Sequence, residues 1–273
     1  MLCEDDMRPC ALVLALLLAL APAAPAVAQP VAVRFAESVT HGFLVMKDAR
    51  GEAIAHGQYL QYPKGEQMHN HLVFRFADGS LYDETVTFTQ QKVFRLIAYH
   101  LVQKGRSFPA SSEVAFDRES GRYRARVGDD KADGTLDLPE DLHNGITGLL
   151  LKNLPVGGRA SGHLMAFTPK PQLLRSTMTR EGEDTFFVSD EPHKAARWLV
   201  NLEVPGVKGL VASLLGKDPP DSRYWIATGS APTFLRFEGA MYLKGPRWRV
   251  EMSAPRWPDA PSRSGPPGSG RRS

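Results

Sequence analysis

Cysteine is nearly absent from this chain of 273 residues. Its two cysteines, Cys3 and Cys10, lie in an N-terminal segment that we expect to be removed on export. The remaining chain would then form no disulfide and offer no thiolate to a metal ion, although an oxidising compartment would permit disulfides. A packed core alone must stabilise the fold, and the length is ample for one β-type domain.

A large excess of charge of one sign is also missing. The chain has 33 basic and 30 acidic side chains and a formal net charge of +3. Domains that bind nucleic acid usually carry a strongly basic patch, so we expect no nucleic-acid partner. Beyond the N-terminal segment, no apolar run reaches the about 20 residues that a transmembrane helix needs. We therefore predict no transmembrane segment in the exported protein.

The short motifs of familiar catalytic sites are absent as well. The sequence has no phosphate-cradling glycine loop and no His-Glu-x-x-His helix. Residues 158–162 resemble a nucleophile elbow only loosely, because Ser161 is misplaced relative to the glycines that the strained turn requires. We accordingly predict no catalytic residue and no cofactor.

An export signal is present at the N-terminus. Residues 12–21 form an apolar run, and Ala26-Val27-Ala28 supplies the small-x-small pattern that a signal peptidase cleaves. We predict that residues 1–28 are a signal peptide, that Gln29 is the first mature residue, and that the protein is periplasmic or extracellular.

The start of this signal departs from the usual pattern in two ways. Cys10 precedes the apolar run, so it is not a lipoprotein cysteine, which would follow the run at the cleavage point. Glu4, Asp5 and Asp6 oppose the positive charge expected at the start of a signal peptide. Translation could therefore start at Met1 or at Met7, and the sequence leaves both open.

Strand patterning covers most of the rest of the chain. Residues 122–127 and 247–252 alternate charged and apolar side chains, which places one strand face on a core and the other in water. The pattern predicts strands at 31–46, 53–62, 70–77, 81–90, 92–103, 112–117, 122–127, 160–168, 172–180, 185–189, 195–204, 223–228, 233–243 and 247–252. Open sheets of that width curl or split into two layers. We predict a mainly β protein: a strongly curved antiparallel sheet, an open barrel or a two-layer β fold.

Two short helices are expected to pack against this sheet. Asp137, Pro139 and Glu140 are typical of a helix start, and apolar residues follow at helical spacing from Leu142 to Leu150. The second helix is predicted at 206–215. Residues 255–273 are rich in Pro, Gly, Ser and Arg and predict a disordered tail. The single β-rich domain would then span residues 29–254.

The predicted strand 92–103 is apolar on both faces. Strict alternation places Phe94, Leu96, Ala98 and Val102 on one face, and Val93, Ile97, Tyr99 and Leu101 on the other. Such a strand is either covered on both sides, here by a short helix, or lines an apolar cavity. In the second case Val93, Ile97, Tyr99 and Leu101 are the candidate cavity residues.

Polar candidates lie on other strands. Arg122, Arg124 and Arg126 share a face and could contact an anionic group, but they could equally protect an edge strand from aggregation. His69 and His71 share a face and are weak candidates for a metal site, which would need further ligands. Asp83 begins a polar face that Thr85, Thr87 and Thr89 continue, while Val86 and Phe88 are expected to face the core.

Several short sequence segments resemble those of a group of uncharacterised, secreted bacterial β-proteins. They are residues 76–80, 103–109, 138–145, 215–221 and 245–249, beginning Phe-Ala-Asp-Gly, Gln-Lys-Gly, Leu-Pro-Glu-Asp-Leu, Leu-Gly-Lys-Asp and Gly-Pro-Arg-Trp. The general layout is similar to the domain-of-unknown-function 3108 type of periplasmic protein. The resemblance implies export and a β architecture, and it brings no activity or catalytic residue.

Three functions are compatible with these features. The first is an exported, non-catalytic envelope protein that binds a lipid-like apolar ligand inside the curved sheet. The second is a structural or protein-interaction module, which predicts a filled interior. The third is a hydrolase with a dispersed polar site, in which His69, His71, His100 or Asp83 would have an acid–base partner in a pocket. The sequence does not give the ligand or the oligomeric state.

Overall fold

Antiparallel strands make up most of the computed structural model, which describes residues 30–155, 157–188, 191–203 and 221–253. The first eight strands are β1 (Thr40–Lys47), β2 (Ala53–Lys64), β3 (Gln67–Phe76), β4 (Leu81–Gln90), β5 (Phe94–Lys104), β6 (Ser112–Asp117), β7 (Arg122–Val127) and β8 (Asp130–Thr135). After helix α2 (Thr147–Asn153) come β9 (Arg159–Phe167), β10 (Pro171–Val188), β11 (Glu191–Glu203), β12 (Ser222–Ala227), β13 (Phe234–Gly239) and β14 (Trp248–Met252).

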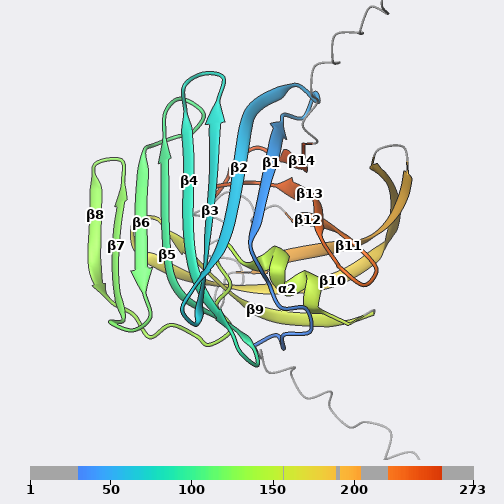
Figure 1. Cartoon of the computed structure of the whole chain (residues 1–273). Coiled ribbons are helices and arrows are strands. Elements are labelled where there is room, and N and C mark those ends of the chain that lie inside the picture. The colour runs from blue at the N-terminus through green and yellow to red at the C-terminus, as the bar shows by residue number, and fades with distance from the viewer. Residues whose placement is uncertain (1–29, 156, 189–190, 204–220, 254–273) are drawn as a thin grey trace, which may run out of the picture.

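All strands belong to one 14-stranded sheet in the order β8-β7-β6-β5-β4-β3-β2-β1-β14-β13-β12-β11-β10-β9. The chain thus makes two meanders, and β14 joins them by pairing with β1 on one side and β13 on the other. The outer strands β8 and β9 do not pair with each other, so the sheet stays open. Figure 1 shows it bent around α2, with β9–β11 crossing β2–β6. The predicted curved antiparallel β class is confirmed.

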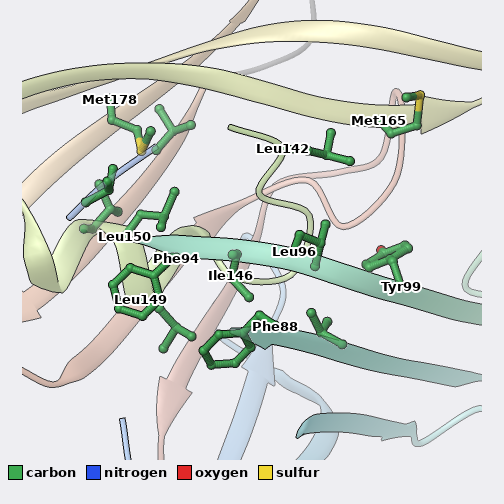
Figure 2. Packing of buried hydrophobic residues seen from close by; sticks show 14 of the residues in the cluster. Phe88, Phe94, Leu96, Tyr99, Leu142, Ile146, Leu149, Leu150, Met165 and Met178 are labelled. Carbon is green, nitrogen blue, oxygen red and sulfur yellow. The ribbon is translucent and has the colours of Figure 1, made fainter. Parts of the chain in front are cut away.

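The core lies inside this bend. One cluster joins Phe88 and Leu96 of the first meander, Leu149 and Leu150 of α2, and Met178 of the second meander (Figure 2). A second cluster surrounds β14. These side chains are buried between the two meanders, and their burial stabilises the bend of the sheet. Each Å² of apolar surface removed from water contributes about 25 cal/mol to the stability of the fold.

Some strand boundaries differ from the prediction. The strands expected at 172–180 and 185–189 are a single strand, β10, because Glu181-Gly182 forms a bulge in the pairing with β11 rather than a turn: Glu181 has no partner, and Gly182 pairs with Arg197. The first strand begins at Thr40, and Ala32 makes only an isolated bridge to Val93. Strand β8 was not predicted, because its sequence Asp-Lys-Ala-Asp-Gly-Thr has almost no apolar side chain.

The first predicted helix begins about ten residues too early. Residues 141–143 bond instead to the backbone of β9, with His143 N donating to His163 O at 3.0 Å and His163 N to Asp141 O at 3.2 Å. Gly145 then takes a left-handed conformation with φ 69°, so α2 starts only after it. Backbone hydrogen bonds to β9 thus replace the intrahelical hydrogen bonds that the sequence pattern favours at these residues. The second predicted helix, the signal peptide and the predicted tail 255–273 lie outside the described residues.

Candidate ligand cavity

A hollow of about 410 Å³ lies on the concave side of the sheet. It is lined by residues from both meanders and from α2, and seven of them are aromatic: Tyr59, Phe74, Tyr82, Tyr99, Tyr224, Phe234 and Phe237. Ligand sites in proteins are typically apolar concavities of about 300–1,000 Å³ with a few placed polar groups. The size and lining of this hollow match that description.

Strand alternation explains why these side chains point inward. On β3, Leu72 and Phe74 line the hollow, while Val73 and Arg75 lie on the outer face. On β4, Tyr82 and Glu84 line the hollow, while Asp83 lies on the outer face. The predicted faces of β4 are confirmed, because Val86 and Phe88 are core residues and Asp83 lies on the other face.

Glu84 is the unusual member of this lining, because it is a carboxylate only 8% exposed among aromatic rings. Its Oε1 accepts hydrogen bonds from the hydroxyls of Tyr99, at 2.8 Å, and Tyr82, at 3.0 Å. Burial raises the pKa of the Glu84 carboxyl, and these two bonds act in the opposite direction. Burial and the neighbouring Glu84 also raise the pKa of both tyrosines, so each hydroxyl keeps its proton and remains a donor.

Gly145 allows the backbone before α2 to approach this carboxylate. A Cβ at Gly145 would lie 2.4 Å from Val86 Cγ2 and 3.3 Å from Glu84 Oε2. The glycine backbone therefore lies against the Oε2 side of Glu84, and both residues line the hollow.

Two further charged residues line the hollow, and they pair with each other. Lys152 of α2 contacts Glu37 at 2.5 Å, and both side chains are largely buried. Gln61 donates to the other oxygen of Glu37 at 3.1 Å and accepts from the Tyr59 hydroxyl at 2.8 Å. The charge of Lys152 is thus already compensated within the protein.

A second hollow of about 490 Å³ lies beside the first. The two share the lining residues Tyr99, Asn144, Leu164, Ala240 and Met241. The second hollow extends towards β6–β8 and β9, and Phe167 and Val114 contribute to its wall. The concave side therefore holds adjoining spaces rather than a solid core along its whole length.

The four residues predicted for a cavity, of which Val93 directly precedes β5 and three lie on it, do not share one face. Tyr99 and Leu101 line the hollows, whereas Val93 and Ile97 line neither. The cause is a bulge: Thr87 pairs with Ala98 and Phe88 with Leu96, so Ile97 has no partner on β4. Phe94 and Leu96 consequently join the core beside α2, and the expected strict alternation along this strand is wrong.

The three arginines of β7 lie exposed on the outer face, opposite the buried Ala125. Arg126 is 3.7 Å from Glu113 of β6. Strand β7 pairs with both β6 and β8, so the interpretation of these arginines as protection of an edge strand is wrong. Contact of Arg122, Arg124 and Arg126 with an anionic group stays a prediction.

His69 and His71 also lie on the outer face, away from the hollows. His71 Nε2 contacts Asp83 Oδ1 at 2.8 Å, and His69 Nδ1 contacts the Thr87 hydroxyl at 3.2 Å. His100 is 3.4 Å from Glu113. None of these residues lines either hollow. In the part of the chain that the structure describes, no three His, Cys, Asp or Glu side chains cluster to hold a metal ion.

A buried polar chain, not predicted from the sequence, ties α2 to β10. His143 contacts the Thr147 hydroxyl through Nδ1 at 2.8 Å and the Ser176 hydroxyl through Nε2 at 2.5 Å. His143 and Ser176 are fully buried and line neither of the two large hollows. A substrate has no access to this serine–histidine pair in the observed conformation, so we interpret it as structural.

Comparison with known proteins gives one structural likeness. No family model and no curated protein matches the chain. A solved structure described as a beta-barrel-like protein of domain of unknown function DUF1849 from Brucella abortus matches with a TM-score of 0.43 and 9% sequence identity, over 80% of this chain and 98% of that one. The resemblance to the 3108 type finds no support here. Among the described residues, no helix has the length and apolar character needed to cross a membrane.

Proposed function

We propose that this protein is an exported, non-catalytic binding protein of the cell envelope that holds a lipid-like apolar molecule on the concave side of its sheet. The observation that carries the proposal is the hollow of about 410 Å³ lined mainly by aromatic and aliphatic side chains. Filling such a space with an apolar molecule removes both its surface and that of the lining from water.

The hollow also favours ligand binding over the alternative of an interaction module. That alternative requires a filled interior, whereas the two adjoining hollows leave the interior incomplete. Export to the envelope rests on the predicted signal peptide at residues 1–28.

The proposal is tested with the neutral fluorescent probe N-phenyl-1-naphthylamine and one pair of variants. Leu72 lines the hollow and Val73, its neighbour on β3, lies on the outer face. Leu72→Trp should weaken probe binding on the order of tenfold or more by occupying ligand space. Val73→Trp adds the same side chain outside the hollow and should leave binding unchanged.

Both variants are first checked for folding by circular dichroism and thermal unfolding. Absence of probe binding to the wild-type protein, or an equal loss in the two variants, would contradict the proposal. Native mass spectrometry of protein purified gently from the periplasm provides an independent check, because a resident ligand adds a discrete mass.

A further inference from the structure

The charge balance of the hollow indicates what kind of ligand it selects. Glu37 and Lys152 compensate each other at 2.5 Å. Glu84 has no ion-pair partner among the described residues, and its polar contacts are the neutral hydroxyls of Tyr82 and Tyr99. When Glu84 is ionised, the hollow therefore carries one uncompensated negative charge.

We infer that the ligand is an amphiphile with a positively charged amine or quaternary ammonium group, which lies against Glu84 while its apolar chain fills the rest of the hollow. This inference rests on the proposed function, because it assigns the ligand class of the same site.

Two features of the site support a cation. First, both tyrosine hydroxyls bond to Oε1 of Glu84, so Oε2 retains its lone pairs for a donor on the ligand. An ammonium group there would compensate a buried charge that is otherwise costly to keep ionised. Second, Tyr59, Phe74, Tyr82 and Tyr99 line the same space. The faces of aromatic rings attract cations, and cages of such rings bind quaternary ammonium groups.

An anionic ligand fits the site less well. A carboxylate or phosphate would meet the like charge of Glu84, and Lys152, the basic residue of the lining, is already held by Glu37. A neutral alcohol can donate one hydrogen bond to Oε2 but leaves the charge uncompensated. The order of affinity expected for a common chain is therefore ammonium above alcohol above carboxylate.

The raised pKa of Glu84 adds a pH signature. Binding of a cation favours the ionised carboxylate, so protonation of Glu84 competes with the ligand. The affinity for a cationic amphiphile should fall as the pH is lowered towards the pKa of Glu84. The affinity for an uncharged amphiphile should not change with the protonation of Glu84.

The experiment measures displacement of N-phenyl-1-naphthylamine by dodecylammonium, dodecanol and dodecanoate at pH 7, below their micelle concentrations. Glu84→Gln keeps the shape of the side chain and an oxygen for the tyrosine hydroxyls, but removes the charge. We expect it to weaken dodecylammonium binding by about 10- to 100-fold and to leave dodecanol binding nearly unchanged, because hydrogen bonds to charged groups are the stronger ones.

Asp83→Asn is the matched control, since it removes the same charge from the adjacent residue on the outer face of β4. It should leave all three affinities unchanged. If dodecanol and the fluorescent probe bind but dodecylammonium has no advantage, or if Glu84→Gln does not reduce that advantage, the inference is wrong and the proposed function stands. If none of the probes binds the wild-type protein, the proposed function itself fails.

Discussion

Replacing Trp248 with alanine is expected to lower the free energy of unfolding by about 3–5 kcal/mol, the usual range for truncating a buried tryptophan. Trp248 is 5% exposed and packs against Phe76, Phe108 and Tyr242, with ring centroids 5.4, 6.1 and 5.8 Å away. The loss is a large share of a typical total stability of about 5–15 kcal/mol.

The position of β14 in the sheet makes Trp248 more important for stability than its buried apolar area alone would indicate. The strand pairs with β1 through Leu44–Lys47 and with β13 through Arg236–Gly239, and it is the strand that connects the two meanders in the sheet. Loss of β14 would leave β1 and β13 with unpaired edges, which are prone to aggregate. We therefore expect the Trp248→Ala protein to be sensitive to protease as well as less stable.

Urea denaturation of the wild type and of Trp248→Ala measures the difference. Arg247→Ala is the control, because Arg247 is exposed beside Trp248 and should change stability by no more than about 0.5 kcal/mol. Arg249 donates to Glu238 at 2.9 Å, but the pair is partly exposed, so its loss should also cost little. A decrease below about 1 kcal/mol in Trp248→Ala would show that β14 does not anchor the sheet.

The inward direction of Trp248 was predictable because alternation is a local property. The same rule placed Val86 and Phe88 on the core face of β4 and Asp83 on the other face, as observed. By the same rule Glu84 falls on the core face. The sequence therefore already indicated a buried carboxylate, because a charged residue occupies a strand position at which an apolar one is expected. Its main donor, Tyr99, lies 15 residues further along the chain on β5, and no local pattern reveals that contact.

Local alternation fails where the pairing of strands intervenes. Ile97 is a bulge because of how β5 pairs with β4, and this shift moves Tyr99 and Leu101 to the face that carries Phe94 and Leu96. Glu181-Gly182 is typical of a turn, but β11 continues alongside it, and Glu181 becomes the extra residue of a bulge. The start of α2 was displaced for a similar reason, since β9 takes the backbone groups of residues 141–143. In each case the cause is hydrogen bonding to another strand, which the local pattern of side chains does not show.

The buried imidazole of His143 is expected to make the protein less stable in mild acid. Burial lowers its pKa from 6.5 to about 4, and the nearby Asp141 opposes this effect while His163 adds to it. The neutral ring is well accommodated, because the hydroxyls of Thr147 and Ser176 contact its two nitrogens. A proton on this ring would introduce a charge where water cannot reach it.

The sign of the pH effect follows from comparing the folded and unfolded states. As the pH falls below about 6.5, the unfolded chain binds a proton on His143 that the folded protein does not accept until about pH 4. The stability that the neutral ring contributes is fully present above about pH 6.5 and is lost as the pH falls through this window. The shift corresponds to about 3 kcal/mol in the free energy of unfolding.

Comparison of the wild type with His143→Gln isolates this contribution. Ionisable groups that do not act on His143, such as Glu84 and His69, contribute equally in both proteins. Their effects therefore cancel in the difference between the two unfolding free energies. That difference should shrink by about 3 kcal/mol between pH 7 and pH 4. Should the variant fail to fold, nuclear magnetic resonance of the wild-type imidazole provides the test, because His143 should remain neutral down to about pH 4. A midpoint near 6.5 would mean that solvent reaches His143, and the contacts between α2 and β10 would then have to open in solution.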